Sequence, residues 1–265
     1  MFKVALYLLI AVILAIFLLP FVYTISPYQL DPTKILQAPS FEHLFGTDRL
    51  GRDMFARVLN GGQTSLIIGF LAASISSIVG LFIGINAGYF KGNIDKTITI
   101  MIDLFLTFPT FFLLLALVSY IQASALILII VISITSWMGM ARMIRSESFA
   151  IGNKPFIKIL KVANVSTFKI IFKYFAPLLA PIFLISFTFG VGGSILAESG
   201  LSFLGLGINP PSMSWGSLLS DGKAVIDIAW WVSFFPGFMI FLITFCLIQI
   251  SDYLQTLANA KEIIA

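Results

Sequence analysis

The chain has 265 residues, of which 59% are hydrophobic and only 11% are charged, and its net charge at pH 7 is +4. Soluble domains carry roughly a quarter charged residues, and a soluble fold of this composition would expose large apolar patches to water. The composition therefore excludes a soluble protein and indicates an integral membrane protein. The basic residues are scattered between apolar blocks, as in cytoplasmic membrane loops, so the positive charge does not indicate a nucleic-acid partner.

Six apolar segments are long enough to cross a membrane, which takes about 20 residues. None contains Lys or Arg, and the only acidic residue within them is Asp103. Their length and lack of alternation exclude a β-barrel, so the expected fold class is an all-α membrane protein with six transmembrane helices. In chain order the expected helices are Val4–Tyr23, Thr64–Tyr89, Thr97–Tyr120, Ile121–Met140, Tyr174–Ala197 and Ile228–Ser251.

The distribution of basic residues predicts the orientation. The first segment is too long for a signal peptide and no Ala-x-Ala site follows it, so we expect it to remain as an anchor. Six spans place both termini on one side. That side would hold eleven of the sixteen Lys and Arg residues: Lys3, Lys91, Lys96, Arg142, Arg145, Lys154, Lys158, Lys161, Lys169, Lys173 and Lys261. Because basic residues gather in the cytoplasm, both termini are expected to be cytoplasmic.

Three connections are long enough to hold structure: Thr24–Gln63 and Glu198–Asp227 outside, and Ala141–Lys173 inside. In the internal one, Pro155–Val162 is expected to form a short amphipathic helix, with Pro at its first turn and Asn164 ending it in the left-handed conformation. Its apolar side holds Phe156, Ile157, Leu160 and Ile159, and its basic side Lys158 and Lys161. Such a helix either lies in the lipid headgroups or docks another protein. A second amphipathic stretch, Ser166–Tyr174, follows.

The chain lacks its own energy source and a catalytic set. There is no phosphate-binding loop, and the spans lack the paired charges of an ion-coupled carrier. Asp103 is either functional or held by Thr99, Thr107 or a neighbouring helix. His43 is the only histidine and Cys246 the only cysteine, which excludes a His-based triad, a two-His metal site and an intrachain disulfide. We expect His43 to be solvated, no metal site and no cofactor.

The two external connections carry distinctive strings. They are FGTDRLGRDMFARVLNGGQTSL (Phe45–Leu66) and GGSILAESGLSFLGLGINPPSMSWGSLLSDG (Gly192–Gly222). Both closely resemble the signatures of the dipeptide, oligopeptide and nickel permease family of binding-protein-dependent ABC importers, and within it the second permease type. The resemblance runs from about Phe41 to Tyr253. It implies the type I importer permease architecture, with the internal helix fitting a groove on an ATPase subunit.

The internal loop departs from the family pattern at two positions. Counting back from Pro177, the family's Glu-Ala-Ala falls on Lys158, Ile159 and Leu160, and its Gly on Asn164. Asn can supply the left-handed turn, whereas Lys158 inverts a charge that usually contacts the ATPase. The resemblance assigns ATPase docking to Pro155, Phe156, Ile157, Lys158, Leu160, Lys161 and Asn164.

In the first external string the residues that match the family are Gly46, Thr47, Asp48, Gly51, Arg52 and Asp53. Their Asp–Arg pattern suits charge-assisted hydrogen bonds, so the string is either a structural clasp over the spans or a substrate contact. In the second, Gly and Pro residues predict a re-entrant or surface-lying scoop. Glu198 either faces the pathway or caps its helix, and Trp215, Trp230 and Trp231 are expected to be interfacial anchors.

The small residues Gly80, Gly84 and Gly88, spaced by four, predict close helix packing within the chain or with a partner. We expect residues 1–63 to form an N-terminal helix with a periplasmic loop, and residues 64–265 a five-helix permease domain with its coupling loop at 141–173.

The predicted function is that of a multi-pass permease subunit of the bacterial inner membrane, forming half of a pathway for di- and oligopeptides. It would hydrolyse no ATP itself. Its partners would be a second permease, two ATPase subunits, an extracytoplasmic binding protein and lipid. The alternatives are a nickel or nickel-chelate permease of the same family, a stand-alone channel or carrier, and an intramembrane enzyme or scaffold.

Overall fold

The computed structural model describes residues 2–121 and 123–264. Within these residues the chain is helical, apart from loops and one isolated β-bridge between Thr47 and Asp53. The elements, in order, are α1 (Phe2–Val22), a 3-10 turn (Pro32–Lys34), α2 (Met54–Phe90), α3 (Gly92–Leu106), α4 (Thr110–Val118), α5 (Ala125–Asn153), α6 (Pro155–Val162), α7 (Thr167–Ile170), a π-helical turn (Ile171–Phe175), α8 (Ala176–Phe203), α9 (Trp215–Lys223) and α10 (Trp231–Ile264).

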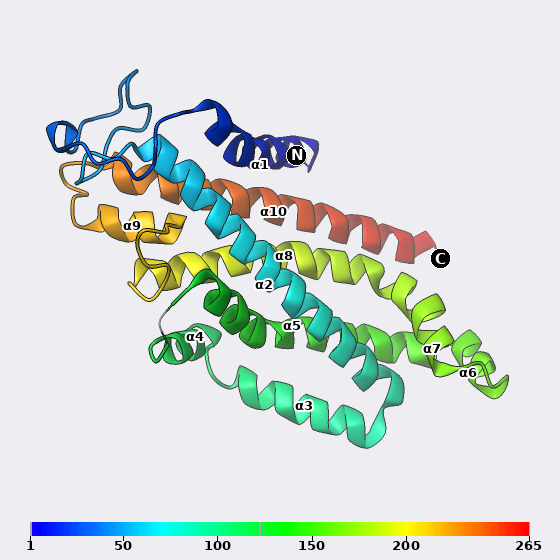
Figure 1. The fold of residues 1–265 in the computed structure, drawn as a ribbon. Helices are drawn as coiled ribbons and strands as arrows, with labels where there is room; N and C mark the ends of the chain where they lie inside the picture. Colours follow the sequence, from blue (N-terminus) through cyan, green and yellow to red (C-terminus); the bar gives the residue numbers. More distant parts are fainter. Residues whose placement is uncertain (1, 122, 265) are drawn as a thin grey trace.

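The helices α2 and α5 pack against each other through the glycine stripe of α2. A Cβ atom on Gly80 would lie 2.7 Å from the Cβ of Met140, and one on Gly84 2.7 Å from the carbonyl oxygen of Ala141. Gly88 packs in the same way against Ser148. The stripe therefore serves packing within the chain, and its order along both helices means that α2 and α5 run parallel (Figure 1).

Two parallel neighbours require the chain between them to cross back, and α3 and α4 make that crossing. Together they are long and apolar enough for one span, but they are bent by 77° at a short break. The expected single helix Thr97–Tyr120 is therefore wrong. The physical reason is Pro109, which has no N–H to donate and disfavours the α conformation at Phe108 before it. The described residues thus hold five helices that are long and apolar enough to cross a membrane, or six spans if the bent pair counts as one.

The helices extend further than the hydropathy predicted. α2 begins at Met54, ten residues before Thr64, because the carboxylate of Asp53 accepts a hydrogen bond from the backbone N–H of Ala56 and caps the helix. α5 continues to Asn153 and α8 to Phe203. The connecting segments are therefore shorter than the three we expected.

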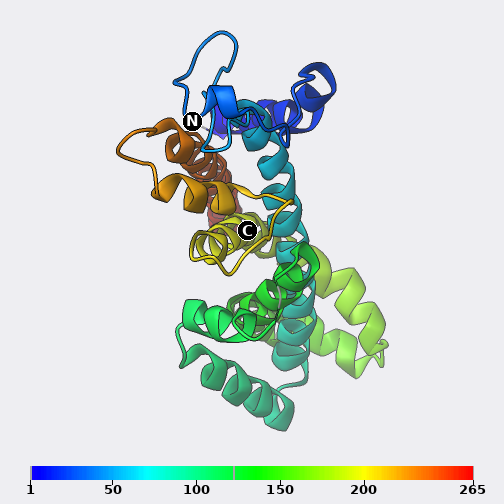
Figure 2. The ribbon, with the colours of Figure 1, turned by 60° about the vertical axis from the view of Figure 1, so that its left-hand side comes forward.

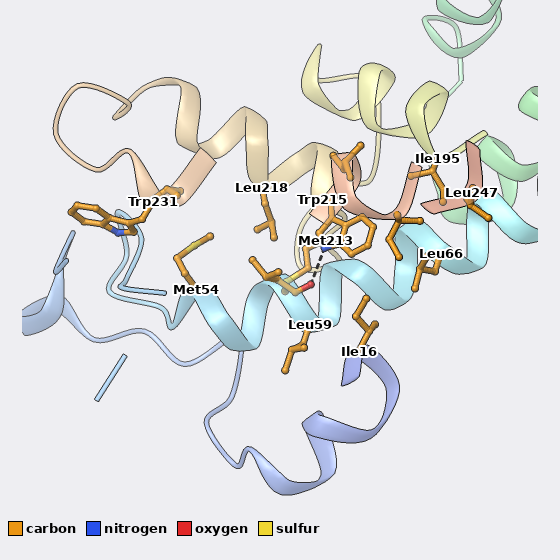
Figure 3. Packing of buried hydrophobic residues seen from close by; sticks show 14 of the residues in the cluster. Ile16, Met54, Leu59, Leu66, Ile195, Met213, Trp215, Leu218, Trp231 and Leu247 are labelled. Carbon is orange, nitrogen blue, oxygen red and sulfur yellow. Dashed lines mark hydrogen bonds between the residues drawn. The ribbon is translucent and has the colours of Figure 1, made fainter. Parts of the chain in front are cut away.

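At one end of the bundle, α9 folds back over α2 and α8. Trp215 is fully buried there, and its indole N–H donates to the carbonyl oxygen of Val58 at 2.9 Å (Figure 3). Met54, Leu59 and Leu218 belong to the same buried cluster. The scoop expected in this region is thus a helix packed into the core, and Trp215 is not an interfacial anchor. Trp231 is also buried, whereas Trp230 is exposed.

Candidate functional sites at the two ends of the helix bundle

The helix α6 lies at the end of the bundle opposite α9 (Figure 1), and it projects from α2 on the side away from α3 (Figure 2). It spans Pro155–Val162, the residues predicted from sequence. Pro155 occupies the first turn, and Asn164 has a φ of 52°, in the left-handed region expected of it. Local signals therefore determine both ends of this helix.

Ile157 is the one fully buried side chain of α6 and is its main anchor to the rest of the fold. It packs in a cluster that includes Ile151, Ile170 and Phe175, with Leu160 partly buried beside it. Phe156 is exposed and Ile159 points outward with 66% of its surface exposed, so the predicted single apolar side is divided between an inner and an outer face.

The outer face of α6 combines apolar and basic side chains. Val162 is 84% exposed beside Ile159, and Lys158 and Lys161 are exposed as well. The ammonium group of Lys161 lies 4.2 Å from the centre of the Tyr89 ring, a cation–π contact. No acidic residue occurs between Glu147 and Glu198, so no acidic side chain from this stretch offsets the charge of the face.

Asp103 does not lie alone in a hydrophobic span. Its carboxylate pairs with Arg142 on α5, and the neighbouring Asp95 pairs with Arg145, whose second contact measures 2.9 Å. Thr107 donates to the backbone oxygen of Asp103, not to its carboxylate. Of the partners we considered for Asp103, the one observed is the neighbouring helix α5, and the two ion pairs hold α3 against it.

The first external loop is held by its signature residues. Asp48 accepts from the Nε of Arg52 at 2.7 Å and from two backbone N–H groups of the same turn. Gly46 and Gly51 have φ values of 73° and 70°, which glycine adopts without steric cost. The carbonyl oxygen of Thr47 accepts from the indole of Trp231 at 3.1 Å. These contacts give the loop the geometry of a clasp between the start of α2 and the start of α10.

His43 is buried, which corrects the expectation that it is solvated. Its Nδ1 lies 2.8 Å from the Oδ2 of Asp53, which also accepts from the hydroxyl of Tyr23 at 3.0 Å. Burial and the neighbouring Asp53 carboxylate raise the pKa of Tyr23 above its ordinary value. Sequence reasoning missed this cluster, because His43 and Tyr23 lie 10 and 30 residues from Asp53 and no local pattern links them.

Glu198 is fully buried beneath α9 and faces neither solvent nor an open channel in this structure. Its two carboxylate oxygens accept hydrogen bonds from Ser65 at 2.9 Å and Ser202 at 2.7 Å. Ser65 also accepts from the backbone N–H of Trp215 at 3.1 Å. The structure therefore favours neither of the two roles we considered, facing the pathway or capping the helix. Glu198 instead joins α2, α8 and α9 in one hydrogen-bonded network.

A cavity of about 620 Å³ lies between the first external loop, the α8–α9 connection and α9. Its charged lining comprises Asp48, Arg49, Arg52, Arg57 and Asp221. Three of these residues, Arg49, Arg57 and Asp221, were not identified from sequence. A signal existed for Arg57, since it is a basic residue inside the first turns of an apolar helix, but nothing local predicts its partner 164 residues away.

Known proteins resemble the chain over most of its length. Residues 80–261 match the family described as binding-protein-dependent transport system inner membrane component. The oligopeptide transport system permease protein OppC of Haemophilus influenzae is 34% identical over 95% of this chain and 81% of its own. The dipeptide transport system permease protein DppC of Alkalihalophilus pseudofirmus is 36% identical over 94% of this chain and 82% of its own.

The fold also resembles that of a solved transporter. A chain of the MetNI methionine ABC transporter, in an inward-facing conformation, superposes with a TM-score of 0.60 over 76% of this chain and 97% of its own, at 15% identity. At this identity the likeness concerns the fold alone.

Proposed function

Since the chain belongs to the family of binding-protein-dependent transport system inner membrane components, we propose that it is the permease subunit of an importer for di- and oligopeptides. The observation that carries this proposal is the match to peptide permeases along nearly the whole chain, including both external strings. The five or six helical spans of membrane-crossing length and composition support a multi-pass protein of the inner membrane.

The energy for transport would come from separate ATPase subunits that dock on α6. This part of the proposal is supported by the structure of α6. Ile157 is buried against the rest of the fold, while Lys158, Ile159 and Val162 remain on the outer face of the helix. A rigid attachment on one side and an unpartnered face on the other suit a helix that transmits motion to α5 and α8. A second permease and an extracytoplasmic binding protein would complete the importer.

Deleting the gene and measuring the uptake of a labelled tripeptide beside that of labelled nickel tests the proposal. We expect tripeptide uptake to fall to the background of the strain and to be restored by a plasmid copy of the gene, while nickel uptake stays unchanged. Loss of nickel uptake alone would contradict a peptide importer. Transport by the purified chain alone, after reconstitution without ATP, would contradict the role of a subunit.

A further inference from the structure

The cavity beside the first external loop has the size and the chemistry of a ligand site. Its volume of about 620 Å³ falls within the range of roughly 300–1,000 Å³ that small-molecule sites occupy. It lies at the end of the bundle opposite α6, where α9 and the first loop meet (Figure 1). Three separate segments converge on it, and each contributes polar groups.

Arg57 is the central charge of this cavity. Only 4% of the residue is exposed, and its Nε has no hydrogen-bond partner among the residues the structure describes. One terminal nitrogen donates to Asp221 at 3.1 Å, while the nearest oxygen of Asp48 stands 3.4 Å from Nε. A buried donor without a partner is unfavourable, so the guanidinium has unused capacity to bind an acceptor.

The carboxylates around Arg57 are already shared. Asp48 is hydrogen-bonded by Arg52 at 2.7 Å, and Asp221 lies 3.9 Å from a terminal nitrogen of the same arginine. Arg49, which is exposed, adds a third guanidinium to the lining. Three arginines face two aspartates, so the lining carries a net charge of +1 and favours an anionic group.

A carboxylate is the anion that suits this arrangement. Guanidinium groups bind carboxylates through paired, charge-assisted hydrogen bonds. The side chain of Asp221 is 42% exposed, so it remains open to a cationic group on the same ligand. A small molecule with a carboxylate and an ammonium group at its two ends would therefore find a partner for each.

We propose that this cavity is a subsite for the C-terminal carboxylate of a peptide, held by Arg57 and Arg52, with Arg49 attracting it at the rim. The inference rests on the proposed function, because the peptide is the ligand that the function supplies. A recess of this volume fits the end of a peptide, whereas a protein partner would require a broader surface.

The test uses the membrane complex of this chain with its native partner subunits, purified through a tag on this chain and without the binding protein. Binding of labelled trialanine in lipid nanodiscs is compared with that of its C-terminal amide and its N-acetyl derivative. We expect the amide to bind at least about tenfold more weakly than the free acid, since a hydrogen bond to a charged group carries such a factor. The N-acetyl peptide should lose less binding affinity than the amide does.

Variants locate the effect in the cavity. Arg57→Lys keeps the positive charge but removes the paired N–H donors of the guanidinium group. It should weaken binding of the free acid about tenfold and leave binding of the amide unchanged. Arg49→Gln, at an exposed position, should weaken binding of the free-acid peptide to a smaller degree without affecting the fold. Lys223→Gln is the matched control, because Lys223 lies on α9 over the ring of Phe203 and outside the cavity lining.

Equal affinities for acid and amide, or undetectable binding of trialanine at millimolar concentration, would overturn the subsite. So would unchanged acid binding in both arginine variants when their thermal unfolding matches that of the wild type. If cells import the tripeptide and acid and amide still bind alike, the subsite fails while the peptide importer stands. If the acid binds selectively but deletion leaves peptide uptake intact, the proposed function fails instead.

Discussion

Among single residues, Asp53 joins three parts of the chain. Its Oδ1 caps α2 through Ala56, and its Oδ2 accepts from Tyr23 after α1 and contacts His43 in the first loop. The carboxylate is buried, so if it were removed, no water could take its place as the hydrogen-bond acceptor of these partners. Removal of Asp53 would therefore leave several polar groups unpaired at once.

We predict that Asp53→Ala lowers the free energy of unfolding by about 3 kcal/mol, the sum of a lost helix cap and of buried donors left without an acceptor. The measurement is thermal and denaturant unfolding in mild detergent, followed by tryptophan fluorescence, since Trp231 contacts the same loop through Thr47. Asp31→Ala is the control, because Asp31 caps only the three-residue turn Pro32–Lys34, and it should change nothing measurable. Equal effects of the two variants would contradict the clasp.

At the scale of helices, the contact of α2 with α5 depends on the absence of side chains. A Cβ atom on Gly88 would lie 2.8 Å from the backbone oxygen of Arg145 and 2.8 Å from the backbone nitrogen of Phe149. Backbone atoms cannot move aside as a flexible side chain can. Gly193 on α8, by contrast, has nothing within 4 Å of the same position.

Gly88→Ala should destabilise the protein by about 1–3 kcal/mol, the usual cost of overpacking. Gly193→Ala should be neutral or slightly stabilising, because alanine favours a helix by up to about 1 kcal/mol over glycine. Unfolding of the two variants in the same detergent gives the comparison. A neutral Gly88→Ala would mean that α2 and α5 are not in close contact.

The outer face of α6 gives the element-scale prediction for coupling. Lys158 is exposed at the position where the family pattern has Glu, so we expect the ATPase groove to be complementary to a positive charge. Lys158→Glu should weaken the association of the ATPase subunits about tenfold, or about 1.4 kcal/mol, and reduce peptide uptake with it. Lys96→Glu reverses an exposed charge on α3 instead and should change neither.

Retention of the ATPase during purification and the rate of ATP hydrolysis by the complex measure this effect. If α6 instead lies in the lipid headgroups, Lys158→Glu would weaken the interaction of α6 with anionic lipid but leave the amount of ATPase retained during purification unchanged. That result would contradict docking of the ATPase on α6.

The accuracy of the sequence predictions depended on how local their signals were. The helix α6 was predicted within its observed bounds, because Pro155 and Asn164 act on the adjacent backbone. The burial of Trp215 and the Arg57–Asp221 pair were not predicted, because their partners lie 157 and 164 residues away. Hydropathy likewise detected the apolar content of the third span but not the bend that Pro109 places in it.

For the whole molecule, we predict an even number of membrane crossings from the directions in which the helices pack. α2 and α5 run parallel through the glycine stripe, so α3 and α4 return between them. α2 and α8 run antiparallel, since Ser65 meets Glu198 while Gly69 packs on Ile195. A re-entrant loop at α3 and α4 would instead leave five crossings and place the two termini on opposite sides of the membrane.

Cysteine labelling distinguishes these topologies. Because Cys246 is the only cysteine, Cys246→Ala gives a cysteine-free chain in one step, and single cysteines then replace the exposed residues Lys3, Arg49, Lys158 and Thr256. We predict that a membrane-impermeant maleimide labels Arg49→Cys in intact spheroplasts and the other three only in inverted vesicles, because we expect the side of the protein that is richer in Lys and Arg to face the cytoplasm. Labelling of Lys3→Cys and Thr256→Cys from opposite sides would show that the bent pair does not cross. Labelling of Lys158→Cys from outside would place α6 where no ATPase could reach it.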